Sequence, residues 1–259
     1  MASGPRLVWH QYRYDQRTFW REPTGVFFTV ALPVIFLFIF VSIFGNDETM
    51  VGGRAVKGST YYVPGILTLA IVSATLVNLA ITVSAARERG ILKRVRGTPL
   101  PPWVFIAGRI GTASGVSVLV VVVLTGLGRL VYGVEVPTTT IPALVLAVLV
   151  GTASLCCAGF ALTGAIRSES AGPAVTNAVV LPAYFFSGIF IPNDDLPAGM
   201  RAIGNLFPIK HLFEAILAAF DPTATAPGIE WGHLAVVLAW GVAGLAIAVR
   251  TFQWAPAGR

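Results

Sequence analysis

Long runs without any charged residue are the feature that most restricts how this chain can fold. Five such runs cover residues 23–46, 58–86, 136–166, 170–193 and 231–249, and a sixth apolar stretch, 103–127, carries only Arg109. Each exceeds the ~18 residues that mark a membrane-crossing helix. Charged residues make up only 12% of the chain, against about 25% in soluble domains. We therefore expect one all-α, polytopic membrane domain with six transmembrane helices over residues 1–259.

The distribution of basic residues predicts the orientation of these spans. Six spans place both termini on one side of the membrane, together with the loop at residues 86–102. That side holds thirteen of the eighteen Lys and Arg residues, Arg109 included. Because short cytoplasmic loops are enriched in Lys and Arg, both termini are expected in the cytoplasm of a bacterial cell. Topology thus explains the net charge of +6, and no nucleic acid partner is expected.

The segment before the first span is expected to form a helix in the lipid headgroup layer. At 100° per residue, one stripe of residues 6–21 is mainly aromatic and the neighbouring stripe is basic. The aromatic stripe contains Trp9, Tyr12, Gln16 and Trp20, and the basic stripe contains Arg6, His10, Arg13, Arg17 and Arg21. Aromatic rings at the interface and guanidinium groups on lipid phosphates suit this position. We assign residues 1–25 to an interfacial helix, for which an ordinary basic anchor is the simpler alternative.

The second loop, residues 86–102, is the most informative connection. It is long enough for a short helix over 87–97, which Gly97 and Pro99 would end. Ile91, Leu92 and Val95 would form one apolar face, surrounded by five basic residues. A short helix of this design suits docking into a groove on a soluble partner. The alternative is a solvated basic loop that only sets topology.

The fifth loop, residues 192–230, contains a second amphipathic pattern. Apolar residues recur with helical spacing at Ile209, Leu212, Phe213, Ile216, Leu217 and Phe220. An apolar helix between two spans is expected to dip into the outer leaflet, where neighbouring protein satisfies its backbone. We therefore predict an external, re-entrant pair of short helices over 199–220. Phe213, Ile216 and Leu217 are the candidate residues for a gate.

Several kinds of chemistry are absent from the sequence. There is no G-x-x-x-x-G-K-[ST] segment for ATP and no G-x-S-x-G segment. The three His residues are scattered, and no pair has the spacing of metal ligands. No Asp, Glu or Lys lies in the middle of a span, although acids there are the usual sign of proton-coupled transport. We expect a chain that is not an enzyme and holds no metal or cofactor of its own.

A few uncharged residues within the spans are candidates for a substrate pathway. Asn78 and Asn177 lie in the second and fifth spans, and Phe185 and Phe186 follow in the fifth. Their polar groups could instead form hydrogen bonds between helices. Small residues recur every four positions from residue 107 to 115. This stripe favours close helix packing, either within the chain or with a second copy.

Two motifs resemble those of a known family, and the match spans essentially the whole chain. The first is Arg87-Glu88-Arg89-Gly90, then Leu92-Lys93-Arg94, then Thr98-Pro99-Leu100 and Gly108-Arg109. It is similar to the E-R-G-T-L-x-x-L-x-x-T-P pattern of ABC-2 type transporter permeases, in particular the daunorubicin-exporter branch. The second is Ser187-Gly188-Ile189-Phe190-Ile191-Pro192, then Leu196-Pro197, Asn205 and Pro208. The chain departs from the pattern at Ile91, at Gly97, and in the spacing of Asn205 and Pro208.

The resemblance implies a permease subunit that works with separate ATPase subunits. Two cytoplasmic ATPases would hold ATP and magnesium, and a second permease subunit would complete the exporter. The segment 87–100 would be the coupling helix, touching the ATPase through Glu88, Arg89, Gly90, Leu92, Lys93, Arg94, Arg96, Thr98 and Pro99. The cargo would be a hydrophobic or amphipathic small molecule, such as a drug or antibiotic, or alternatively a lipid or glycolipid. A stand-alone channel or secondary carrier, and a sensory or assembly subunit, remain alternatives of other classes.

Overall fold

The computed structural model of the protein describes residues 4–45, 47–51, 54–98, 100–134, 138–221 and 227–254. Five helical segments in these ranges are long and apolar enough to cross a membrane. They are α2 (Pro23–Val26), η1 (Phe27–Ala31) and α3 (Leu32–Phe44); α4 (Gly58–Val72), η2 (Ser73–Val77) and α5 (Asn78–Glu88); α7 (Pro102–Tyr132); α8 (Ile141–Leu162); and α12 (Trp231–Thr251). The π-helical turns η1 and η2 continue their helices without a break. The expected all-α, polytopic membrane fold is therefore confirmed.

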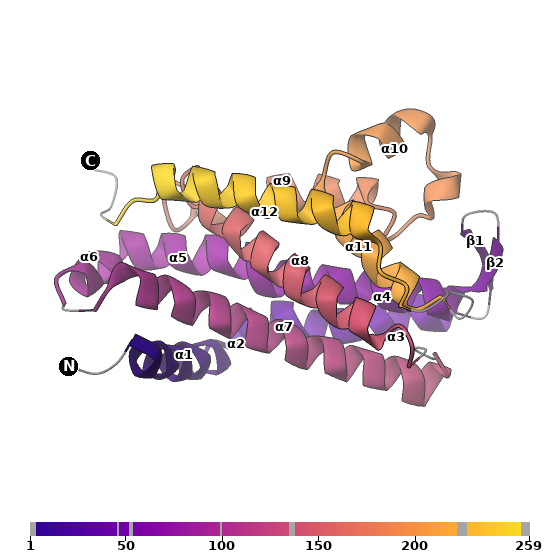
Figure 1. The fold of residues 1–259 in the computed structure, drawn as a ribbon, viewed down its shortest axis with the longest axis horizontal. Coiled ribbons are helices and arrows are strands. Elements are labelled where there is room, and N and C mark those ends of the chain that lie inside the picture. Colours follow the sequence, from indigo (N-terminus) through magenta and orange to yellow (C-terminus); the bar gives the residue numbers. More distant parts are fainter. Residues whose placement is uncertain are drawn as a thin grey trace.

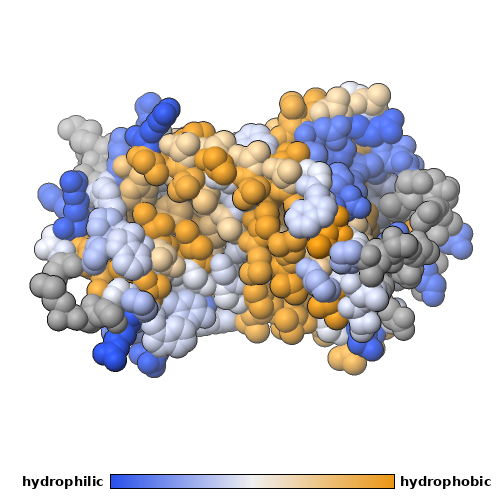
Figure 2. Space-filling model, in the orientation of Figure 1, coloured by the Kyte–Doolittle hydropathy of each residue, from blue (hydrophilic) through white to orange (hydrophobic). Residues whose placement is uncertain are grey.

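The spanning helices lie side by side along one long axis (Figure 1). The N-terminal helix α1 (Gly4–Trp20), the short helix α6 (Ile91–Arg96) and the C-terminal end of α12 lie at one end. The opposite end carries a hairpin of β1 (Glu48–Val51) and β2 (Arg54–Lys57), and helix α10 (Ala198–Gly204). Hydrophobic residues form a band across the middle of the surface, between two hydrophilic ends (Figure 2). This arrangement matches the polarity of a bilayer, whose apolar core lies between two polar headgroup layers.

The fifth expected span, 170–193, is shorter in the structure than in the prediction. Helix α9 covers only Ala171–Phe186, about 24 Å at 1.5 Å per residue, whereas the hydrocarbon core is about 30 Å thick. The chain then turns at Gly188, whose φ of 85° suits glycine, and forms the single turn η3 (Asn193–Asp195). By length and composition, the sixth possible span is the bent pair α10 and α11.

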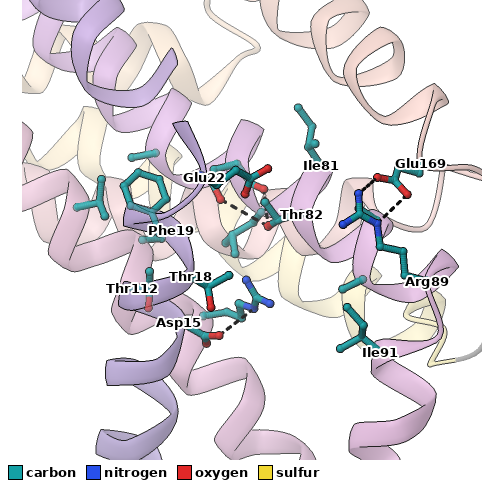
Figure 3. A pocket seen from close by; sticks show the side chains of 18 of the residues that line it. Asp15, Thr18, Phe19, Glu22, Ile81, Thr82, Arg89, Ile91, Thr112 and Glu169 are labelled. Atoms are coloured by element: carbon teal, nitrogen blue, oxygen red, sulfur yellow. Dashed lines mark hydrogen bonds and ion pairs between the residues drawn. The ribbon is translucent and has the colours of Figure 1, made fainter. Parts of the chain in front are cut away.

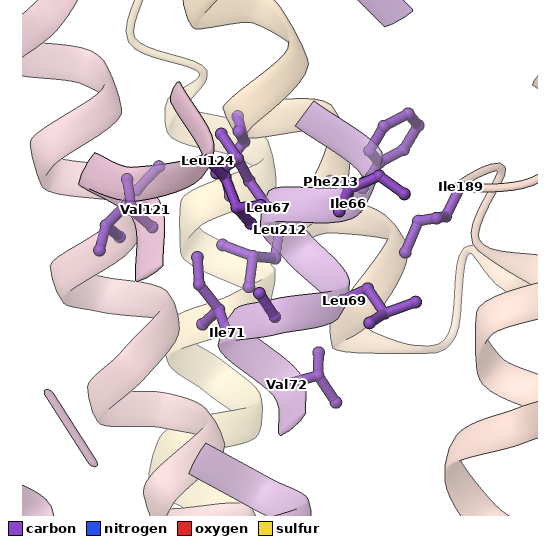
Figure 4. Close-up of a cluster of buried hydrophobic side chains, with 14 of the residues drawn as sticks. Ile66, Leu67, Leu69, Ile71, Val72, Val121, Leu124, Ile189, Leu212 and Phe213 are labelled. Carbon is purple, nitrogen blue, oxygen red and sulfur yellow. The ribbon is translucent and has the colours of Figure 1, made fainter. Parts of the chain in front are cut away.

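The predicted pair of short helices before the last span is present. Helices α10 and α11 (Pro208–Ala219) meet at an angle of 93°. Helix α11 packs deep inside the bundle, because its apolar face meets the almost completely buried helix α4. Figure 4 shows this core, where Leu212 and Phe213 of α11 lie beside Ile66 and Leu67 of α4.

The hairpin β1–β2 was not predicted. Its strands pair antiparallel, with Glu48 opposite Lys57 and Val51 opposite Arg54. Each strand has only four residues, which is too short for an alternating pattern to stand out in the sequence.

Candidate functional site

The chain bends sharply between the second span and the predicted coupling segment. Helix α5 ends at Glu88, Gly90 adopts a left-handed conformation with φ of 71°, and α6 begins at Ile91. A left-handed residue interrupts a right-handed helix. The segment 87–97, expected to be a single helix, therefore consists of the end of α5, a turn at Gly90 and helix α6, and we call this segment the elbow. Helix α6 ends at Arg96, and Gly97, the predicted stop, is its C-cap. Pro99 lies outside the described residues.

Leu92 attaches α6 to its own chain rather than facing outward. Its side chain is fully buried in an apolar cluster with Phe105 of α7, Phe160 of α8 and Ala248 of α12. The expected apolar face is therefore divided, because Leu92 points inward while Ile91 remains 41% exposed. A six-residue helix is marginal in water by itself, so this burial holds α6 in place. Leu92 cannot serve as an exposed docking contact in this conformation.

The outer side of α6 is a dense basic surface. The side chains of Lys93, Arg94 and Arg96 are exposed, and none forms an ion pair with another residue in the described part of the chain. Thr98 is exposed as well, and its hydroxyl donates to the carbonyl of Val95 at 2.6 Å. Three cations grouped on one packed helix make this surface strongly positive.

Three consecutive residues, the last two of α5 and the one that follows it, bind the connection between α8 and α9. The buried Arg87 guanidinium donates to the carbonyl of Thr163 at 3.0 Å and to the carbonyl of Ile166. Glu88 accepts a hydrogen bond from the backbone N–H of Glu169. Arg89 forms a two-pronged ion pair with the Glu169 carboxylate, with Nε to Oε2 at 3.0 Å (Figure 3).

These contacts change the interpretation of the predicted coupling residues. Glu88 and Arg89, expected to meet a partner, are engaged within the chain. The Arg89 guanidinium also holds the pKa of Glu169 below its ordinary value, because it donates hydrogen bonds to the ionised carboxylate. Arg87 was not among the predicted site residues, since an arginine at the end of a span is already explained by membrane topology.

A cavity of about 280 Å³ lies next to the elbow. Residues of α1, α5, α7 and α9 line it, and Arg89, Ile91 and Glu169 form one of its walls (Figure 3). Asn78 lines this cavity, and its role in a substrate pathway stays a prediction. The other candidates do not join it, because Asn177 and Phe185 are exposed on α9 and Phe186 is partly buried. The predicted pathway residues thus occupy separate places.

A charged pair connects α1 to α7 beside this cavity. Asp15 is almost completely buried, and its Oδ1 lies 3.7 Å from Nε of Arg109. Gln11 donates to Oδ2 of Asp15 at 3.1 Å. Burial raises the pKa of Asp15, and the nearby Arg109 and Gln11 partly offset this. No sequence pattern predicted this pair, because its members are 94 positions apart.

Small residues of α7 accommodate α1 within the same chain. A Cβ atom at Gly108 would lie 2.4 Å from Cγ of Gln11, and one at Gly115 would lie 2.9 Å from Nε2 of Gln16. Gly115 belongs to the predicted small-residue stripe and Gly108 lies next to it. The stripe therefore packs against α1, one of the two alternatives that the sequence left open. The basic stripe of α1 remains exposed, as do Trp9 and Trp20. Its expected place in the headgroup layer stays a prediction.

The predicted gate residues belong to the central core. Phe213 and Ile216 are fully buried, and Leu217 packs partly buried at the edge of the core. The ring of Phe213 meets Tyr61 of α4 edge-on, with centroids 5.4 Å apart. A gating motion at these residues would have to repack this core, so their gate role stays a prediction.

Two histidines that looked scattered in the sequence meet in the structure. Nδ1 of His211 on α11 lies 2.8 Å from Nδ1 of His233 on α12. Nε2 of His211 donates to the carbonyl of Asn205 at 2.9 Å. No cluster of three or more His, Cys, Asp or Glu residues that could hold a metal ion occurs in the described ranges.

Comparison with known proteins places this architecture in a family. The sequence profile described as "ABC-2 type transporter" matches residues 6–220. The inner membrane transport permease YadH of Escherichia coli K12 is 25% identical over 224 residues, covering 82% of this chain and 84% of the relative. YadH of Shigella flexneri matches to the same extent. The family profile includes the elbow, the cavity and the α10–α11 pair, and the chain belongs to the ABC-2 type transporter family.

Proposed function

We propose that this chain is the membrane permease subunit of an ATP-driven exporter, and that α6 docks on a separate ATPase subunit. The family supports a transport component of the inner membrane with several spans. The chain has no P-loop sequence of its own, so ATP and magnesium would be bound by two partner ATPases. A second permease subunit would complete the complex, with both termini and α6 in the cytoplasm.

The basic surface of α6 is the observation that carries this proposal. Lys93, Arg94 and Arg96 are exposed together, on a helix that Leu92 fixes to the bundle. These three cations repel one another because they lie close together. Acidic side chains in a groove on the ATPase would offset that repulsion. Because α6 is firmly packed, an ATPase that closes on ATP would move the helices behind it rather than α6 alone.

The cavity beside the elbow supports a small amphipathic cargo. Its volume of about 280 Å³ is close to the lower end of ligand pockets, at about 300 Å³. Apolar side chains such as Phe19 and Val116 share its wall with Asn78 and Thr82. The main candidate is a drug or antibiotic, which would make the complex a multidrug efflux or resistance exporter. A lipid or glycolipid is the second candidate, because the cavity borders α1, the helix expected among lipid headgroups.

The docking role is tested by reversing the charges on α6. The variant Lys93→Glu/Arg94→Glu/Arg96→Glu is expected to retain the ATPase subunit at least about tenfold more weakly when the tagged permease is purified from its host, since attraction becomes repulsion. Arg129→Glu is the control, because Arg129 is exposed at the far end of α7. Equal retention by the triple variant would contradict docking through α6. A permease that never retains an ATPase would favour a stand-alone carrier.

A further inference from the structure

The residues Arg87, Glu88 and Arg89 all attach to one stretch of chain, although about 80 positions separate them from it. We call this stretch, residues 163–170, the α8–α9 connection. Arg87 binds its beginning through the carbonyls of Thr163 and Ile166. Glu88 and Arg89 bind its end at Glu169, two residues before α9 starts. The elbow is therefore bonded to this connection at both of its ends.

The two sets of contacts differ in their exposure to solvent. Arg87 is 5% exposed, and its guanidinium satisfies a carbonyl at the end of α8 that has no partner within the helix. The Arg89–Glu169 pair is on the surface, with side chains 63% and 39% exposed. It is nevertheless two-pronged, and Glu88 holds the backbone of the same residue. Together these contacts fix the position of Glu169 from two directions.

Helix α9 follows directly after this connection, and a displacement of the connection could move it. Only five of its sixteen residues are buried: Gly172, Thr176, Val180, Ala183 and Tyr184. Its other residues, including Ala174 in the first turn, are exposed or partly exposed. The first half of α9 is buried only at Gly172 and Thr176. It can therefore shift while Val180, Ala183 and Tyr184 in the second half stay in the core.

We propose that Arg87, Glu88 and Arg89 form a transmission link that carries a displacement of α6 into α9, with Arg89 and Glu169 as its decisive pair. These are positioning residues that act through the α8–α9 connection. The inference rests on the proposed docking of an ATPase on α6, and it adds the route by which that motion reaches the fifth span. It also predicts that Arg89 and Glu169, which form part of one cavity wall, move during the ATP cycle.

A reporter on α9 tests this link directly. In a background where Cys156 and Cys157 are replaced by Ala, Ala174→Cys is labelled with bimane, and the full complex is purified from its host. The emission change on adding ATP and vanadate reports movement of α9. We expect Arg89→Glu to reduce that change at least about fivefold, while Arg89→Glu/Glu169→Arg restores most of it. Arg167→Glu is the matched control, because Arg167 is exposed in the same connection and forms no ion pair with a described residue.

Each outcome decides between the docking proposal and the link. An undiminished emission change in Arg89→Glu would overturn the link, and so would a change that Arg167→Glu reduces equally. Loss of the ATPase subunit from Arg89→Glu would make Arg89 a docking residue instead. If the parent complex keeps its ATPase but shows no emission change, only the link fails. If the parent permease retains no ATPase, the proposed function fails with it.

Discussion

Replacing Leu92 by Ala should loosen α6 even when no partner is present. The Leu92 side chain is fully buried among residues of α5, α7, α8 and α12, and truncating such a side chain costs about 2–5 kcal/mol. The rest of α6 offers little compensation, because six residues do not form a stable helix alone. If about 3 kcal/mol is lost locally, the equilibrium between docked and released α6 shifts roughly 100-fold.

Amide hydrogen exchange of the isolated, detergent-solubilised permease measures this shift. The amides of Arg94 and Gly97 are the probes, because they bond to the carbonyls of Gly90 and Lys93 in α6. Their exchange is expected to accelerate roughly 100-fold in Leu92→Ala, as opening of α6 controls their protection.

Ile91→Ala is the matched control, since Ile91 is the neighbouring residue of α6 and is 41% exposed. It should accelerate exchange several-fold at most. Unchanged protection in Leu92→Ala would refute the argument that burial holds α6. If Leu92→Ala instead weakened only the binding of an ATPase, Leu92 would be the docking contact that the sequence suggested.

Three further predictions follow from individual contacts. Gly108→Val should detach α1 and cost about 1–3 kcal/mol, because even the Cβ atom of the new side chain would lie 2.4 Å from Cγ of Gln11; exchange of α1 amides measures it. Arg87→Met should lower stability by about 3 kcal/mol in thermal unfolding, since two carbonyl bonds to a charged donor are lost. The Arg89–Glu169 pair should be intact above the ordinary glutamate pKa of 4.5 and open as pH falls through the lowered pKa of Glu169, which infrared titration of the carboxylate would follow.

Each of these predictions has an internal control. Gly126→Val changes the same residue type on α7 where a Cβ would meet nothing within 4 Å, so equal destabilisation by both variants would argue against the α1 contact. Arg87→Lys keeps the charge and should recover part of the stability. Glu169→Gln should abolish the acid-induced opening, and a transition that persists in this variant would assign it to another group.

The elbow illustrates how far sequence reasoning could go. The basic residues, the stop at Gly97 and the short amphipathic segment all predicted a small helix after the second span, and α6 is there. The inward direction of Leu92 could not be predicted, because one apolar residue in a six-residue helix fits an external groove as well as an internal one. The bond between Arg89 and Glu169 joins residues 80 positions apart, a separation at which a single sequence gives no pairing signal.

The sequence by itself determined the membrane class, most of the spans and the two amphipathic segments. These follow from the cost of placing charge in hydrocarbon and from helical periodicity, which act on each segment separately. Only the tertiary structure decided which helices are neighbours. It placed α1 against the small residues of α7, shortened the fifth span to α9, brought His211 to His233, and fastened the elbow to the α8–α9 connection. These contacts depend on how all helices pack together, and that arrangement is a property of the whole chain.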